Sequence, residues 1–457
     1  MTKVQYRLAA LSALATAALA LAACNSEPNV RASGPSTDAA PAATISKITL
    51  EAYSKDRSAA VATTAAAPQD LLRAALTLAV PPLQSSVFTS NGPITLAEQA
   101  IVFPALQAAR MDVLRAASAG DTLAEVQAAV PTAASLEATR SLLGGLSRQI
   151  WASASATFAR SFLASTEISG APASGWQANT VLDWSSPLAA LAEFGPTSDL
   201  SLVPQTRMVI GQRFDLQSVS NAQALGFEGL GESAQDGWYI AMMVAFEGPG
   251  GSVNVDGYSA TATWVGEHLW VSLRPPGNKP LLEGLAPSTL SAALLAVWSA
   301  YPSPQGLVTR SRQVWPQLTA SLVDRGKLPV GIVLPYNPVS ANLGGLDGGG
   351  TYLTETARAA ALSIDTGGLR ASGAQTMAFT FSAENMFSNS YGYGVITLQP
   401  NVQITPSVFL TPCPRAVPDW RGAYLALIDR AGRLLLLATL PKPTGAVALT
   451  RCLSDPG

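Results

Sequence analysis

The sequence is poor in the residues that metal binding and catalysis usually require. Its 457 residues include one histidine and three cysteines, too few ligands to favour a structural zinc site. No serine sits in a G-x-S-x-G pattern, and the glycine run at 344–350 lacks the G-K-[ST] ending of a phosphate-binding loop. The histidine, His268, lies in a predicted strand and is better explained as a structural residue than as a base. We therefore expect no enzyme activity, no metal and no cofactor.

Charged residues are also scarce, at 13% of the chain, and the net charge is −2. This balance offers no electrostatic attraction for nucleic acid, so we expect no such partner. Hydrophobic residues make up 48% of the chain, enough to bury a large core. Beyond the N-terminal segment, no stretch of the sequence is long and apolar enough to span a bilayer.

The first residues have the pattern of an export signal. Lys3 and Arg7 precede a run over 8–23 made almost wholly of Ala, Leu, Ser and Thr, the charged start and apolar body of a secretory signal. The run is shorter than the roughly 20 residues of a membrane-spanning helix. It ends in Leu-Ala-Ala before Cys24, which resembles the lipobox of bacterial lipoproteins, where the cysteine carries lipid.

This resemblance implies a lipoprotein signal peptide over 1–23 and a lipid anchor on Cys24, with the protein exported to the cell envelope, on its periplasmic face or at the cell surface. The alternative is a plain secretion signal, which would give an extracellular protein. Residues 24–69 are rich in Ala, Ser, Thr, Pro and Asn and have few large apolar side chains, which predicts a flexible tether. The span 70–457 is expected to form the folded domain.

Cysteine usage agrees with export. If Cys24 carries lipid, Cys413 and Cys452 remain as an even pair in an oxidising compartment. A disulfide between them would close a loop of about 40 residues and stabilise the fold by about 4 kcal/mol in the loop-entropy model. The alternative is two unrelated thiols.

The most informative pattern lies late in the chain. After Gly367 and Gly368, the odd positions from 369 to 381 are mostly apolar or small, and the even positions are polar or small. This period of two is what a half-buried strand requires. The register puts Arg370 on the solvent face, where its charge stays hydrated. It leaves Gln375 as the polar exception on the inward face.

The order of elements around this strand resembles a serpin, the family of suicide protease inhibitors. In serpins a strand ends in a V-D-E-x-G hinge, which leads through small residues into an exposed reactive loop and then a C-terminal hairpin. Residues 364–368 (IDTGG) match the hinge except that Thr366 replaces its glutamate. Residues 421–443 match the family's R-P-F-x-F-x-I-x-D…G-x-I-L-F…P, with Gly432 and Pro443 at the family's spacing.

Two earlier segments match in the expected order. Residues 103–106 (FPAL) followed by 120–122 (GDT) have the spacing of the family's S-P-x-S…G-x-T at the start of a helix beneath the central sheet. Phe103 and Leu106 replace both serines, so a polar cluster under the sheet is expected to be lost. Residues 206–212 fall where the family has T-x-L-V-L-V-N, with Gln212 in place of the asparagine.

The resemblance implies an α+β fold over 70–457: a large central, mostly antiparallel sheet, smaller sheets with packed helices, and an exposed reactive loop. It also implies a monomeric inhibitor whose loop is cleaved and then inserts into the central sheet. Counted from the hinge, the scissile region is Phe381, Ser382 and Ala383. The hinge that must enter the sheet comprises Gly367, Gly368, Leu369, Arg370, Ala371, Ser372, Gly373 and Ala374.

The implied partner is a serine protease, with a cysteine protease as the second option. Phe381 beside a Ser382–Ala383 scissile bond would suit the apolar pockets of chymotrypsin-, subtilisin- or elastase-like enzymes. No Arg or Lys occurs from 371 to 414, which argues against a trypsin-like target. Met386 and Phe387 form an alternative cleavage site.

Some departures from the family concern inhibition. Thr366 at the hinge, and Arg358 where serpins often have histidine, alter polar contacts that govern sheet opening. The alternative interpretation is that 369–382 is a permanent strand and that the chain is a non-inhibitory serpin-fold surface protein that acts as a binding scaffold. The long segment 383–420 is rich in Tyr, Ser, Gly and Asn near its start. It either contacts a partner or is an inserted hairpin without a binding role.

Overall fold

The structure is a computed structural model that describes residues 46–56, 66–80, 100–129, 138–167, 176–194, 202–219, 223–233, 237–274, 285–324, 332–381, 423–440 and 448–449. The chain divides into two units, 1–44 and 45–457, and the described residues all belong to the second. The predicted signal peptide 1–23, Cys24, Ser382, Ala383, the segment 383–420 and the proposed disulfide partners Cys413 and Cys452 lie outside the described residues.

Helices and strands are mixed in the first part of the described chain, whereas 206–274 and 351–449 contain successive strands. The helices are α2 (Leu50–Lys55), α3 (Pro68–Ala79), α4 (Pro104–Ala117), α5 (Gly120–Ala129), α7 (Arg160–Ser165), α8 (Leu188–Leu191), η2 (Ala192–Phe194), α9 (Pro287–Ala300), η4 (Leu334–Tyr336) and α10 (Gly344–Asp347). The strands are β1 (Lys47–Thr49), β2 (Ala100–Val102), β3 (Ser147–Ser153), β4 (Thr157–Ala159), β5 (Trp176–Val181), β6 (Thr206–Val219), β7 (Gln223–Ser233), β8 (Gly237–Val255), β9 (Tyr258–Val265), β10 (His268–Arg274), β11 (Arg310–Pro316), β12 (Leu318–Asp324), β13 (Thr351–Asp365), β14 (Gly368–Phe381), β15 (Ala423–Asp429), β16 (Leu434–Leu440) and β17 (Ala448–Leu449).

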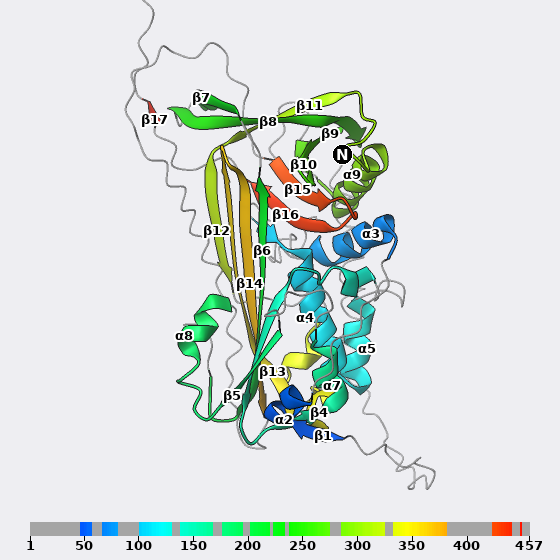
Figure 1. Ribbon diagram of the computed structural model, residues 1–457, viewed down its shortest axis with the longest axis vertical. Helices are drawn as coiled ribbons and strands as arrows, with labels where there is room; N and C mark the ends of the chain where they lie inside the picture. The colour runs from blue at the N-terminus through cyan, green and yellow to red at the C-terminus, as the bar shows by residue number, and fades with distance from the viewer. Residues whose placement is uncertain are drawn as a thin grey trace, which may run out of the picture. The chain divides into compact units, whose positions relative to one another are not determined.

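A six-stranded sheet with the order β12-β13-β14-β6-β3-β5 forms the centre of the fold. Every neighbouring pair in it is antiparallel except β3 and β5, which are parallel. Figure 1 shows α4, α5 and α7 on one side of this sheet and α8 on the other. The predicted α+β fold with a large, mostly antiparallel central sheet is confirmed.

Helix α4 packs against one face of the central sheet. Pro104 occupies its first turn, where a missing N–H costs nothing. Almost all of its residues are buried, including the polar Gln107, Arg110 and Asp112. A helix buried on all sides belongs to the interior of a protein rather than to its surface, so α4 can position polar groups beneath the sheet.

The opposite face of the sheet carries a second, smaller apolar cluster. Trp184 and Phe194, which flank α8, pack there with Trp151 of β3 and Ala378 of β14. Phe194 lies so close to Gly211 of β6 that a Cβ at that position would come within 2.6 Å of its ring. The indole of Trp184 donates to the Thr206 carbonyl at 2.8 Å. These contacts hold the segment 184–194 against this face of the sheet.

A second sheet has nine strands, with β11-β8-β9-β10-β15-β16-β2 as its main path. All seven residues of β15 and all seven of β16 are buried, which is typical of strands with both faces covered. The turn between them is closed by Asp429, whose Oδ1 accepts the N–H groups of Ala431 and Arg433 at 2.9 Å each. Gly432 adopts φ 82° there. The predicted C-terminal hairpin is present.

The folded part begins earlier than the predicted boundary at residue 70. Strand β1 pairs with β4 through Lys47 and Ala159, within a span expected to be tether. Leu50 and Tyr53 of α2 are 2% and 6% exposed, and the Tyr53 hydroxyl donates to Glu167 at 2.6 Å. A few large side chains thus suffice to dock a segment whose overall composition is that of a linker. Within the described segments, no helix has both the length and the apolar character needed to cross a bilayer.

Docking of α2 predicts a measurable loss of stability for Leu50→Ala. Removing a fully buried leucine side chain should lower the free energy of unfolding by about 2–4 kcal/mol. Lys55→Ala on the same helix, where the side chain is 74% exposed, should change it by less than about 0.5 kcal/mol. Urea unfolding of both variants provides the comparison. Equal stabilities of the two variants would mean that α2 is not docked and that 47–55 is part of the tether.

Candidate functional site

Strand β14 occupies the middle of the six-stranded sheet. It pairs with β13 from Gly368, opposite Asp365, to Phe381, opposite Thr351. On its other side it pairs with β6 from Gly368 to Thr380. The segment expected to be an exposed reactive loop is therefore, in this structure, a central strand. This is the position that such a loop reaches after insertion.

The predicted hinge lies at the tight turn between β13 and β14. Thr366 and Gly367 form the turn, the Gly367 N–H donates to Asp365 Oδ1 at 2.7 Å, and Gly368 has φ 116°. Only glycine adopts such a backbone conformation at low cost. Arg370 follows with its side chain 63% exposed and 4.0 Å from Asp365, on the solvent face as the alternation predicts. The hinge residues Leu369, Ala371 and Gly373 face inward and are buried, while Ser372 and Ala374 on the opposite face are half-buried.

The inward face of β14 fits closely over the start of α4. A Cβ at Gly373 would lie 2.4 Å from the Phe103 ring and 2.7 Å from Leu106 Cδ1, closer than real atoms approach. Phe103 and Leu106 are the residues that replace the two serines of the family pattern. A glycine on the strand thus makes room for the two larger side chains beneath it.

A polar cluster under the sheet exists, contrary to the expectation from the two missing serines. The Gln375 amide donates to the Leu106 carbonyl at 2.6 Å and contacts the Gln212 amide on β6. When the Gln212 amide is turned the other way, its oxygen accepts from Arg148 Nη2 at 2.9 Å and from Nε at 3.0 Å. Arg358 lies opposite Gln375 on β13. Longer side chains from neighbouring strands therefore replace the short hydroxyls.

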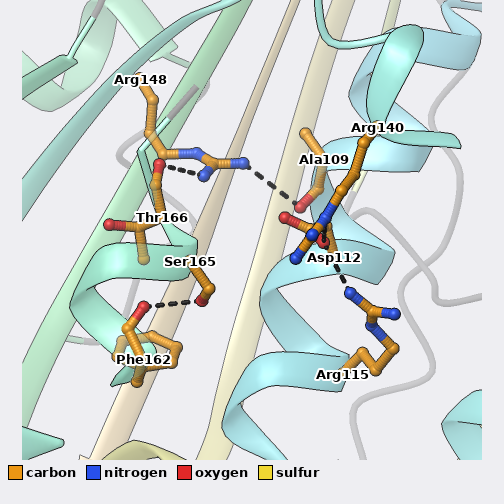
Figure 2. Close-up of polar contacts among 8 residues, drawn as sticks. All are labelled: Ala109, Asp112, Arg115, Arg140, Arg148, Phe162, Ser165 and Thr166. Atoms are coloured by element: carbon orange, nitrogen blue, oxygen red, sulfur yellow. Dashed lines mark hydrogen bonds and ion pairs between the residues drawn. The ribbon is translucent and has the colours of Figure 1, made fainter. Parts of the chain in front are cut away.

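Arg148 anchors this cluster from below. Its side chain is fully buried, and its guanidinium donates to the carbonyls of Thr166 and Ala109, the latter at 3.5 Å (Figure 2). Burial lowers the pKa of Arg148 to about 10, while the negative charge of Asp112 opposes this shift. The group is thus still protonated at neutral pH. Its charge requires partners because an unpaired buried cation is strongly destabilising.

Asp112 of α4 supplies the negative charge in this layer. Its carboxylate is 3% exposed and accepts from Arg115 at 3.1 Å and from Arg140 at 3.3 Å, as Figure 2 shows. Asp112 and Arg148 were not predicted from the sequence, because a charged residue within an apolar run is usually assigned to the surface. The available signal was the presence of Arg110, Asp112 and Arg115 in a helix expected to lie beneath the central sheet.

His268 lies at the upper end of β14, near its first residues. Its Nδ1 is 3.2 Å from the Ser218 hydroxyl, which also accepts from the Trp270 indole at 2.9 Å. Ser218 is 1% exposed and pairs with Leu369. The Asp429 carboxylate nearby accepts from Ala431, Arg433 and the Arg433 side chain. These contacts join β10 to the end of β6, which accounts for His268 as a structural residue.

Phe381, the predicted residue beside the scissile bond, ends β14 and is 38% exposed. Its ring lies under the Arg207 guanidinium, 4.7 Å from ring centroid to Cζ. Ser382 and Ala383 lie outside the described residues, so the scissile bond stays a prediction. Among the residues that the structure describes, no group of three or more His, Cys, Asp or Glu side chains could hold a metal ion.

Gln375→Leu is predicted to destabilise the six-stranded form. The substitution leaves the Leu106 carbonyl and the Gln212 amide with one fewer polar partner inside the core, at a cost of about 2–3 kcal/mol. Ser372→Ala, three residues away on the half-buried face, should cost less than about 1 kcal/mol. Urea unfolding measures both. Equal effects would mean that the cluster has no energetic role.

The partial burial of His268 predicts that the stability of the protein depends on pH. Burial lowers its pKa, while Asp429 and Glu267 oppose this effect and Arg433 adds to it. The unfolded chain therefore binds the proton more readily, and stability should fall as pH drops from about 7.5 through the ordinary histidine range. Because His268 is the single histidine, His268→Gln should flatten the curve of unfolding free energy between about pH 5.5 and 7.5. An unchanged slope in that variant would contradict the assignment.

Comparison with solved structures identifies the fold. No protein-family model and no curated protein matches the sequence. A structure titled cleaved Serpin 42Da superposes with a TM-score of 0.56 and 12% identity, covering 81% of this chain and 98% of that one. The thermophilic serpin tengpin in the latent state gives 0.53 and 13%, covering 82% and 98%. Reactive-loop-cleaved human thyroxine-binding globulin gives 0.50 and 16%, covering 68% and 98%. The chain therefore has the serpin fold.

Proposed function

We propose that this protein is a serpin-type protease inhibitor that is exported and anchored through lipid on Cys24. The observation that carries the proposal is the complete accommodation of 368–381 as a central strand. The reaction begins when a protease cleaves the chain after Phe381, at the Ser382–Ala383 bond or close to it. The strand then enters the sheet with the protease still attached.

The fit of the inserted strand supplies the driving force. Leu369, Met377 and Phe379 are each 0% exposed in the sheet, and burying such side chains stabilises by about 1.5–3 kcal/mol each. The strand also completes two antiparallel ladders, with β13 and with β6. Each net backbone hydrogen bond adds about 1 kcal/mol. The insertion would therefore be strongly favourable for a segment that starts in solvent.

The covalent step is an interrupted hydrolysis. The protease serine Oγ bonds to the scissile carbonyl carbon, the C–N bond breaks, and the protease's histidine transfers the serine proton to the departing amine. The inhibitor then carries an ester at its new C-terminus. Fourteen residues of β14 at about 3.3 Å each would carry that ester about 46 Å along the sheet. Transport over such a distance competes with attack by water on the ester.

The protease class follows from the residues beside the cut. Phe381 and the small residues after it suit an enzyme with an apolar or small pocket, such as a chymotrypsin-, subtilisin- or elastase-like serine protease. The segment 371–414 contains no Arg or Lys, so a trypsin-like enzyme has no site within it.

A second candidate function is a non-inhibitory binding scaffold. The observation in its favour is that β14 is inserted in a chain that has not been cut. Residues 382–422 connect β14 to β15, and about 40 residues can span up to about 140 Å, so the connection permits insertion without cleavage. Human thyroxine-binding globulin, a matched structure, is named for a ligand that it binds. In this case 383–420 would be a binding segment.

Incubation with chymotrypsin or subtilisin distinguishes the two functions. The inhibitor is predicted to form a covalent, protease-sized product on denaturing gels, with trypsin as a negative control. Gly373→Leu should be cleaved but form almost no complex, because its side chain would clash with Phe103 and block insertion. Ser372→Ala, whose side chain faces the other side, should form the complex like the wild type.

The scaffold predicts a different outcome in the same experiment. Wild-type protein would then be nicked near 380 without a covalent product. The nicked protein would also melt no higher than the intact one, because no strain remains to be released by insertion. That pair of results would reject the inhibitory function.

A further inference from the structure

Both strands beside β14 contain an extra residue at the same level, near its lower end. On β6, Phe379 pairs with Met208 and Thr380 pairs with Thr206, so Arg207 is the additional residue. On β13, Leu353 pairs with Phe379 and Glu355 with Ala378, so Thr354 is the additional residue. Bulges of this kind redirect side chains and pin the register of the strands they adjoin.

Each additional residue places its side chain on β14. The Thr354 hydroxyl donates to the Ala378 carbonyl at 2.9 Å and lies 3.0 Å from the Thr380 hydroxyl. The Arg207 guanidinium covers the Phe381 ring at 4.7 Å, within the range of a cation–π interaction. The Phe381 N–H donates to the Gln205 carbonyl at 3.1 Å. The last four residues of β14 are thus held from both sides.

A turn rich in glycine packs against the Phe381 ring. Gly348, Gly349 and Gly350 all have positive φ, at 90°, 123° and 82°. A Cβ at Gly350 would lie 2.7 Å from Phe381 Cε2, so the ring occupies the space that a side chain would need. The turn therefore fits closely against the ring at Gly350. We refer to Thr354, Arg207 and Gly350 together as the foot lock.

The foot lock restrains the end of β14, whereas Gln375 restrains its middle. Because side chains alternate with period two, a strand that slips by two residues keeps its apolar face inward. Gln375 opposes slippage in the middle of the strand through Leu106 and Gln212. Residues beyond it, at the end of a strand, are where fraying begins. In the foot lock, Arg207 and Gly350 contact the final residue, Phe381, in addition to its backbone bond with Gln205, and Thr354 holds the two positions 378 and 380 before it.

We propose that the foot lock fixes the depth of insertion and holds the last residues of β14 paired. This inference rests on the proposed inhibitory function for its consequence: the ester formed just after Phe381 stays at the end of the sheet, and the trapped protease stays against it. Arg207 and Thr354 are therefore positioning residues. They determine how long the complex lasts and do not take part in its formation.

Hydrogen exchange measured by mass spectrometry tests the lock independently of inhibition. The variants are Arg207→Gln and Thr354→Val, each close in size to the original residue. In protein nicked after Phe381, exchange over 376–381 should be about tenfold faster in each variant, with 368–375 unchanged. The matched control is Arg213→Gln, on the same strand, where the arginine is exposed and pairs with Asp215 at 2.9 Å. Exchange in both variants equal to that of the control would overturn the proposal.

The lifetime of the protease complex tests the consequence. Both variants should form the complex in the same yield as the wild type but release active protease about tenfold sooner. Faster exchange without earlier release would overturn the proposed role in holding the ester. If the wild type forms no complex while exchange follows the predicted pattern, the lock is supported and the inhibitory function alone is rejected.

Discussion

The structure depends on how closely the inward face of β14 fits the start of α4. Phe103 and Leu106 fill the space beneath the sheet, and the strand crosses them where Gly373 has no side chain. Two positions further along, Gln375 meets the Leu106 carbonyl and the Gln212 amide. The contact at position 373 therefore accepts only glycine, and the contact at position 375 requires a hydrogen-bond donor. Together these two neighbouring contacts specify one register for β14.

The buried polar layer connects this contact with the rest of the fold. Arg148 joins β3 to the carbonyls of Ala109 on α4 and Thr166 after α7. Replacing such a group with an apolar one of equal size is often tolerated, whereas removing one partner of a buried charge is costly. The layer thus contributes specificity of arrangement more than net stability.

Several parts of this structure could be predicted from the sequence. The alternation over 369–381 gave the strand, its inward face and the exposed position of Arg370, because period two is a direct consequence of strand geometry. The C-terminal hairpin followed from the resemblance of 421–443 to the serpin pattern, with Gly432 at the expected turn position. The polar cluster could not be predicted, because Gln212, Gln375 and Arg148 are far apart in sequence and their contact depends on strand order. The bulges at Thr354 and Arg207 have no sequence signal either, and the docked segment Lys47–Lys55 was hidden by its linker-like composition.

The central claim is that 368–381 lies as a strand between β13 and β6 in the cleaved protein. Ser372 on β14 and Asp215 on β6 are paired neighbours in this sheet, at a separation that a disulfide can bridge. The most direct measurement is therefore peptide mapping of a disulfide in the double variant Ser372→Cys and Asp215→Cys, under oxidising conditions, after cleavage beyond Phe381. The account predicts that the bridge forms in most of the cleaved protein. Its absence from correctly folded, cleaved protein would contradict the account.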